Sequence, residues 1–331
     1  MEQPEPEPEP EPRRLVGAPT SACPAVVLGS VLDAELFERV RRDFFRVVES
    51  EFQPPEKDDS FTSGTYWFSL PAAGQGAAPR NAIEAAAIAI SCSEPFRELL
   101  NVGSLTGVEW WFQEQGPEDA AKDYHTDCDV QIKRGHGAQG DVVVERRPLL
   151  SSVFYLDDFG GPTVVFGQTE PESGARLSPR LPRSAVASFP HPNQLLVFRG
   201  DLFHGVLATT QPNPTERSRF TLLLNWWSDR PHGPADLPPC FVFAQRHEPT
   251  SCAAGADRAC RREYAEWAAP DHASFAQSGH LAAWQAQRLP GELERVARTP
   301  GAPLRITYAA PVPEQDSGED SEKDWTELEE G

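Results

Sequence analysis

The chain has 331 residues, of which 39% are hydrophobic and 24% are charged, a composition typical of a globular protein with a buried core. It contains no run of 18 apolar residues, so the sequence predicts no membrane-spanning helix. The formal net charge is −20, and a surface of that charge repels a phosphate backbone, which argues against nucleic acid as a partner.

The two ends of the chain are acidic and unlike the rest. Residues 1–22 begin with a Glu-Pro repeat, which predicts an extended, disordered arm because proline prevents helix and the glutamates repel one another. Residues 312–331 carry nine acidic residues and one Lys, and they predict a disordered acidic tail. Most of the net charge therefore belongs to the ends of the chain.

Residues 23–106 are expected to form a helical support region. Apolar side chains recur at helical spacing over residues 32–52, with Asp33 placed to cap the start of the helix. A second helix is predicted over residues 80–100, where AIEAAAIAI is rich in good helix formers. We expect these two helices to pack together on one face of a sheet.

Between residues 107 and 230 the pattern changes to short apolar segments rich in β-branched and aromatic residues. Gly, Pro, Asp and Asn separate them, as is typical of strands joined by turns in a sandwich or barrel. The pairs Trp110–Trp111 and Trp226–Trp227 each predict one buried and one surface ring, because strand side chains alternate. The predicted strands are VEWWF (108–112), LLSSVFYL (149–156), PTVVF (162–166), QLLVF (194–198), HGVLA (204–208) and FTLLLNWW (220–227).

Residues 231–311 give weaker signals and are expected to form a C-terminal extension. Helices are predicted over residues 258–267 and 280–298, and a strand is predicted over residues 303–308, PLRITY.

Six cysteines occur without a CxxC pair and without a secretory signal segment, which predicts free thiols and an intracellular protein, cytoplasmic or nuclear. Cys252 and Cys260 lie near His247, but their spacing fits no usual zinc site.

The segment YHTDCD contains the most informative chemistry in the chain. On a strand, His125 and Asp127 would share a face, so an imidazole and a carboxylate could bind one metal ion. Asp129 shares that face, either as an alternative ligand, as a partner to a ligand or as a solvated turn residue, whereas Cys128 points the other way and is expected in the core.

A third ligand is predicted at His204, which follows an apolar strand and a Gly-Asp turn. Two His and one carboxylate leave positions open on a metal ion, as in non-haem Fe(II) oxygenases, for a chelating cosubstrate and O₂. A cosubstrate with a distal carboxylate needs a cation deeper in the barrel, and Arg219, with Thr221 on the same strand face, is the preferred candidate. Arg217 has the same parity and is the competing choice.

HTD (125–127), the His of GDLFHGV (200–206) and the Arg of RFT (219–221) resemble the Fe(II)/2-oxoglutarate-dependent dioxygenase superfamily. SSVFYLDDFGGPTVVF (151–166) resembles the strand–turn–strand of its prolyl-hydroxylase-like branch, and the combination with EWWF is similar to a poorly characterised eukaryotic group. The resemblance covers about residues 107–228.

The resemblance implies an α+β fold whose catalytic core, residues 107–230, is a double-stranded β-helix, or jelly-roll, with the N-terminal helices packed on one sheet. It implies that His125, Asp127 and His204 bind Fe(II), that Arg219 binds the C5 carboxylate of 2-oxoglutarate, and that Tyr155 helps to hold it. The implied activity is oxygenation with 2-oxoglutarate and O₂, most simply hydroxylation.

Two other hypotheses about the function remain open. A non-catalytic metal- or ligand-binding jelly-roll could act as a scaffold with acidic interaction tails, and a cupin-type metalloenzyme could work without a 2-oxo acid. The sequence identifies neither the substrate, which could be a protein side chain or a small molecule, nor the oligomeric state.

Overall fold

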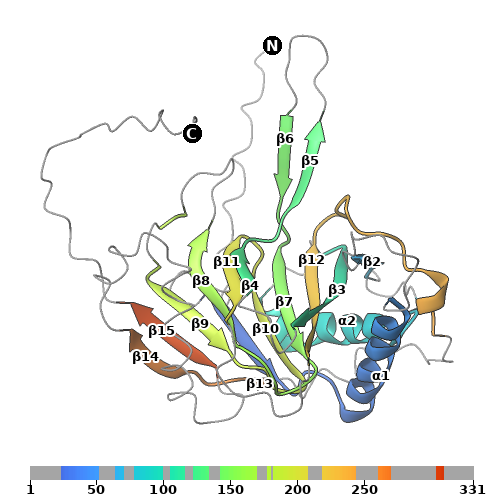
Figure 1. Ribbon diagram of the computed structural model, residues 1–331, viewed down its shortest axis with the longest axis horizontal. Coiled ribbons are helices and arrows are strands. Elements are labelled where there is room, and N and C mark those ends of the chain that lie inside the picture. The colour runs from blue at the N-terminus through green and yellow to red at the C-terminus, as the bar shows by residue number, and fades with distance from the viewer. Residues whose placement is uncertain are drawn as a thin grey trace, which may run out of the picture.

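The computed structural model describes residues 24–51, 64–70, 78–99, 105–115, 122–133, 142–169, 177–179, 182–207, 218–243, 260–269 and 303–308. Two sheets face each other, and the helices lie on the outer face of one of them (Figure 1). None of the helices in these residues is long and apolar enough to cross a membrane.

The first sheet has seven strands, and the helices pack on it. In spatial order these are β13 (Cys260–Arg261), β1 (Ala25–Gly29), β10 (Gln194–Arg199), β7 (Leu150–Tyr155), β12 (Arg219–Trp227), β3 (Gly107–Gln115) and β2 (Tyr66–Ser69). All of its neighbouring strands are antiparallel.

The second sheet has six strands. In spatial order these are β14 (Ala265–Ala269), β15 (Leu304–Tyr308), β9 (Ser184–Ser188), β8 (Thr163–Thr169), β11 (Leu202–Val206) and β4 (Lys122–His125). Only β14 and β15 pair in parallel among the described strands. A separate hairpin of β5 (Asp129–Lys133) and β6 (Val142–Arg146) projects beyond both sheets (Figure 1).

From β3 to β12 the chain passes repeatedly between the two sheets. β3, β7, β10 and β12 belong to the first sheet, whereas β4, β8, β9 and β11 belong to the second. This sheet-rich arrangement with few helices fits the predicted jelly-roll. The sheets also take in β1, β2, β13, β14 and β15, which lie outside residues 107–230.

Three helices cover the outer face of the first sheet: α1 (Ala34–Glu51), α2 (Ala82–Cys92) and α3 (Glu94–Arg97). Asp33 accepts a hydrogen bond from the Leu36 amide (2.7 Å), and Asn81 accepts one from the Glu84 amide (2.9 Å), so each of the first two helices starts at a side-chain cap. The helix predicted over residues 80–100 is broken at Ser93, and Pro95 opens the short helix that follows.

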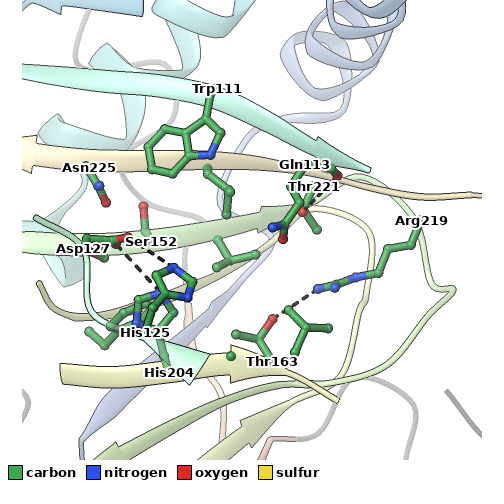
Figure 2. A pocket seen from close by; sticks show the side chains of 16 residues that line it. Trp111, Gln113, His125, Asp127, Ser152, Thr163, His204, Arg219, Thr221 and Asn225 are labelled. Atoms are coloured by element: carbon green, nitrogen blue, oxygen red, sulfur yellow. Dashed lines mark hydrogen bonds and ion pairs between the residues drawn. The ribbon is translucent and has the colours of Figure 1, made fainter. Parts of the chain in front are cut away.

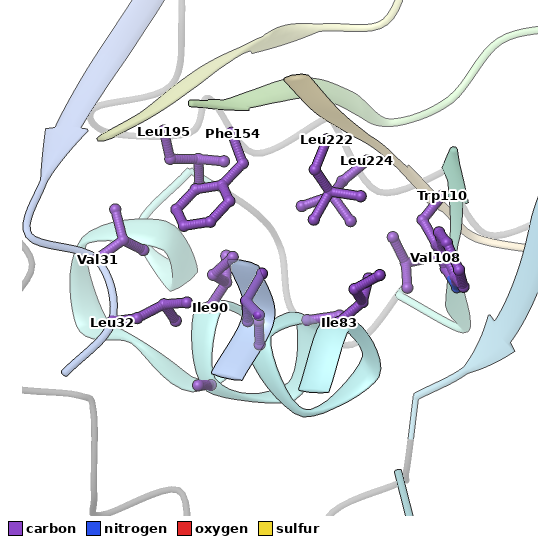
Figure 3. Close-up of a cluster of buried hydrophobic side chains, with 14 of the residues drawn as sticks. Val31, Leu32, Ile83, Ile90, Val108, Trp110, Phe154, Leu195, Leu222 and Leu224 are labelled. Atoms are coloured by element: carbon purple, nitrogen blue, oxygen red, sulfur yellow. The ribbon is translucent and has the colours of Figure 1, made fainter. Parts of the chain in front are cut away.

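Alternation along the strands of the first sheet divides their side chains between two cores. Trp110, Phe154, Leu222 and Leu224 face α2, where they pack against Ile83 and Ile90 (Figure 3). Between the sheets lies a separate cluster that includes Val27, Val153, Leu196 and Phe198 from the first sheet and Val165 and Val186 from the second. A sheet buried on both faces is a rigid support for side chains that point into the space between the sheets.

Of the predictions for the C-terminal region, one is wrong, one is confirmed and one lies outside the described residues. The helix predicted over residues 258–267 is wrong, because this segment supplies the edge strand β13 and the start of β14. The strand predicted over residues 303–308 is confirmed as β15. The helix predicted over residues 280–298 lies outside the described residues, as do both acidic ends.

The prediction of free thiols is wrong for Cys92, which is disulfide-bonded, and holds for Cys128 and Cys240. Sequence spacing missed this bond because it depends on the fold. The bond also removes the argument from free thiols for a reducing compartment. Cys252 and His247 lie outside the described residues.

Candidate active site

Three metal-binding side chains converge at one end of the space between the sheets. His125 ends β4, Asp127 lies in the connection that follows, and His204 lies in β11. His204 pairs directly with His125 across the β4–β11 ladder, which brings the two ring centroids within 4.5 Å. One donor atom from each of the three residues lies within 4.8 Å of the other two (Figure 2).

The Asp127 carboxylate lies close to both imidazoles. Its Oδ1 is 3.6 Å from His125 Nε2, and its Oδ2 is 3.9 Å from His204 Nε2. Ligands that bind one ion at about 2.1 Å and at right angles lie about 3 Å apart. Small side-chain movements would therefore bring all three donors to a common metal ion.

Neighbouring groups orient two of these donors. His204 Nδ1 lies 3.0 Å from the carbonyl oxygen of Leu202, and donation of a proton to it leaves Nε2 free to bind metal. The Ser151 hydroxyl donates to Asp127 Oδ2 at 2.6 Å. Ser151 was not predicted as a site residue, because its contact with Asp127 joins residues 24 positions apart in the chain.

The expectation that His125 and Asp127 occupy one strand is wrong, because β4 ends at His125. Cys128 is exposed rather than in the core, since the chain leaves the sheet there. Asp129 begins β5, and its carboxylate accepts hydrogen bonds from Gln131 Nε2 and the His232 amide, both at 3.1 Å. It is not one of the three converging donors.

The electrostatics of the three donors suit a divalent cation. Burial alone would raise the pKa of Asp127, but attraction to His204 and hydrogen bonds from His125 and Ser151 lower that pKa to about 2. Burial lowers the pKa of His204, despite the opposing effect of Asp127. At neutral pH a charged carboxylate therefore stands beside a neutral imidazole, the protonation states that bind metal.

Arg219, at the start of β12, points into the same cavity from its other end (Figure 2). Its side chain is almost fully buried, at 2% exposure. Nη1 donates to Gln115 Oε1 (3.3 Å) and Nη2 donates to Thr163 Oγ1 (3.1 Å), whereas Nε is buried without a hydrogen-bond partner among the described residues.

No described carboxylate forms a salt bridge with Arg219. Burial lowers its pKa, and nearby Asp157 partly opposes that shift. A buried guanidinium held by neutral partners is a ready site for an anion.

Gly160 makes room for the Arg219 side chain. Its φ of +103° is one that residues with a Cβ rarely adopt, and an added Cβ would clash with Cδ of Arg219. Gly160 lies in the turn of the segment SSVFYLDDFGGPTVVF (151–166), but its packing against Arg219 was not predicted.

The other predicted site residues lie nearby. Thr221 lines the cavity, with its hydroxyl 3.5 Å from the carbonyl oxygen of Gln113. Tyr155 packs beside Arg219, with the guanidinium carbon 5.6 Å from the ring centre, and its hydroxyl donates to the carbonyl of Ser188 at 3.0 Å. Arg217 lies outside the described residues.

The cavity that joins these groups has a volume of about 540 Å³, its open mouth included. His125, Asp127 and His204 line one part, and Arg219, Thr163 and Thr221 line another. Trp111 also lines it, while Trp110 is buried against the helices, so the strand places the two rings of this pair on opposite faces. Asn225 lines the cavity as well and was missed in the sequence.

No family model and no curated protein matches the sequence. The solved structures that it resembles include a prolyl-4-hydroxylase from Pseudomonas putida, which is 20% identical, with 62% of this chain and 92% of that chain covered and a TM-score of 0.35.

Two further similar structures are the non-heme α-ketoglutarate-dependent epimerase SnoN from nogalamycin biosynthesis and HygX from Streptomyces hygroscopicus with nickel and 2-oxoglutarate bound. SnoN is 14% identical, with 72% of this chain and 91% of that chain covered and a TM-score of 0.38. HygX is 15% identical, with 64% of this chain and 82% of that chain covered and a TM-score of 0.32.

Proposed function

We propose that this chain is an Fe(II)- and 2-oxoglutarate-dependent oxygenase with a jelly-roll core, and that it hydroxylates its substrate. One observation carries the proposal: a single cavity has two imidazoles and a carboxylate in one part and a buried guanidinium in another.

The three donors fit Fe(II) by their chemistry. His125, Asp127 and His204 supply two nitrogen ligands and one oxygen ligand from one side, and they leave the remaining coordination positions open. A structural zinc site would instead be closed by four protein ligands. Ser151 and the Leu202 carbonyl hold Asp127 and His204 in place.

The distance along the strands suits a short dicarboxylate such as 2-oxoglutarate. Val165 of β8 pairs with His204, and Thr163, two residues before Val165 in β8, contacts Arg219. Two strand residues span about 7 Å. In the proposal Arg219 binds the C5 carboxylate, the Thr221 hydroxyl adds a hydrogen bond to that carboxylate, and the Tyr155 ring packs against the guanidinium.

When bound, iron and 2-oxoglutarate would supply the oxidising chemistry, in which O₂ adds one oxygen atom to the substrate and the other to succinate, with release of CO₂. The chain's own residues bind and orient the metal ion and the cosubstrate. Asp127 offers a carboxylate that stays ionised, His204 offers a neutral nitrogen, and Arg219 fixes the cosubstrate in a cavity walled by Trp111 and Phe198.

The test is conversion of 2-oxoglutarate to succinate by the full chain with Fe(II), ascorbate and O₂. We expect slow turnover without substrate, and its loss in His125→Ala and in His204→Ala. His191→Ala is the matched control, since His191 lies outside the cavity lining and contacts the Pro192 carbonyl. Activity unchanged in both site variants would contradict the proposal.

Metal binding without any 2-oxoglutarate turnover would favour the scaffold alternative. Turnover of another substrate with no effect of Arg219→Ala would favour a cupin-type enzyme.

A further inference from the structure

A second cavity of about 480 Å³ lies beside the candidate metal centre. It shares the side chains of Trp111, Asp127 and Asn225 with the first cavity, so the two adjoin at a metal-binding residue. A substrate whose reacting carbon points at the metal would have this space for the rest of the molecule. Its lining therefore bears on the class of substrate.

The walls of the second cavity come from two paired strands and the segment after them. Glu109 and Trp111 share one face of β3 because side chains alternate along the strand, and Asn225 of β12 pairs with Glu109. Trp227 Nε1 donates to Glu109 Oε2 at 3.1 Å, which fixes the carboxylate and the indole together. The EWWF motif thus supplies an acid and an aromatic ring to this cavity.

The described lining of this cavity carries carboxylates and no Lys or Arg. Glu109, Asp127 and Asp129 all reach it. Burial raises the pKa of Glu109, and the nearby charges of Asp127 and Asp129 raise it further, against hydrogen bonds from Thr65 and Trp227. His232 Nδ1 lies 3.4 Å from Asp129 Oδ2, but its side chain is 66% exposed. A bound cation would relieve the repulsion between these acids.

A loaded metal centre would leave that charge in place. A divalent ion, the Asp127 carboxylate, a dianionic cosubstrate and the Arg219 guanidinium together carry no net charge, so a loaded metal centre would not neutralise the charges of Glu109 and Asp129. Aromatic faces such as those of Trp111 and Trp227 also attract organic cations.

We propose that this second cavity binds a cationic nitrogen group of the substrate, an ammonium or a guanidinium, between the Glu109 and Asp129 carboxylates and the Trp111 and Trp227 rings. As a substrate assignment it rests on the proposed oxygenase function, but the cation site itself does not require metal or turnover. The same chemistry could come from a free amine or from a basic side chain in a peptide.

The test is a ligand-observed NMR titration of the full chain in the presence of a metal chelator. The probes are pentylammonium, its neutral and anionic analogues pentan-1-ol and pentanoate, and the peptide acetyl-Gly-Lys-Gly-amide. We expect pentylammonium to bind about tenfold or more tightly than pentan-1-ol and pentanoate, and to weaken as salt is added. Tighter binding of the peptide than of pentylammonium would identify a side chain as the source, and the reverse would identify a free amine.

Isosteric variants locate the cation. Glu109→Gln and Asp129→Asn should each weaken pentylammonium binding about tenfold, whereas Glu114→Gln, on the opposite face of β3, should leave it unchanged. Circular dichroism checks that each variant is folded.

The proposal is overturned if no cationic probe binds saturably, if pentan-1-ol binds as well as pentylammonium, or if Asp127→Asn abolishes binding while Glu109→Gln does not. Since the assay uses no iron and no 2-oxoglutarate, its failure is distinct from failure of the oxygenase reaction.

Discussion

Replacing Arg219 by Met should strongly weaken cosubstrate binding without unfolding the chain. Met keeps an unbranched stem that can pack against Gly160 but removes the charge. The substitution therefore separates the role of Arg219 in binding from its role in the fold.

The magnitudes follow from the contacts of the guanidinium. The substitution removes two hydrogen bonds, to Gln115 (3.3 Å) and Thr163 (3.1 Å), each of which contributes about 1.5–3 kcal/mol because the donor is charged. It also removes a buried charge that forms no salt bridge with a described carboxylate, and the desolvation of such a charge costs several kcal/mol. We expect the free energy of unfolding of the metal-free protein to stay within about 1 kcal/mol of wild type, or to rise by up to about 3 kcal/mol.

The affinity for 2-oxoglutarate, in contrast to the free energy of unfolding, should fall. Removing one member of a buried, hydrogen-bonded charge pair costs about 2–5 kcal/mol. The Kd for 2-oxoglutarate should therefore rise roughly 30-fold to 4,000-fold. Urea unfolding measures the stability, and calorimetric titration of the Mn(II)-loaded protein with 2-oxoglutarate measures the affinity.

The control is Arg199→Met, since Arg199 is exposed and pairs only with Asp201 among the described residues. Two results would contradict the anion-binding role of Arg219. One is a Kd that stays within about threefold of wild type, and the other is a loss of more than about 3 kcal/mol in unfolding free energy, because Arg219 would then stabilise the fold rather than bind an anion.

Three further predictions concern the same site. Gly160→Ala should lower the unfolding free energy by about 1–3 kcal/mol and weaken 2-oxoglutarate binding, because φ is +103° and the new Cβ would displace Arg219. Thermal unfolding measures the loss of stability, and Gly233→Ala is the control, since a Cβ at that position meets nothing within 4 Å. Ser151→Ala should weaken metal binding about 10-fold to 100-fold in a chelator competition, since it removes the 2.6 Å hydrogen bond to Asp127, and an affinity equal to wild type would count against this role. At pH 7, metal binding should release less than one proton, because the pKa of Asp127 is about 2 and burial lowers the pKa of His204. Calorimetry repeated in two buffers measures the proton release, and release of nearly two protons would contradict these protonation states.

The sequence predicted the strands that lie deepest in the two sheets. Runs such as QLLVF and FTLLLNWW appear as β10 and β12 because they are buried and continuous. It failed at edge strands, where pairing rather than composition decides the structure. The segment around Cys260, predicted as helix, is extended because β1 offers a free edge to it. One interior strand, β9 between β15 and β8, was also not predicted.

At the site, the sequence identified the three donors and Arg219 through residue types and their order along strands. It placed Asp127 on the wrong element, because the end of β4 depends on where its partner β11 stops pairing. Ser151, Gly160 and Asn225 could not be assigned from local pattern, since their importance arises from contacts between residues far apart in the chain.

The most direct measurement is a crystal structure of the full chain grown anaerobically with Fe(II) and 2-oxoglutarate. We expect one metal ion bound at about 2.2 Å by His125, Asp127 and His204, with the distal carboxylate of the cosubstrate on the Arg219 guanidinium. Metal bound by other residues, or a cosubstrate carboxylate that does not reach Arg219, would contradict it.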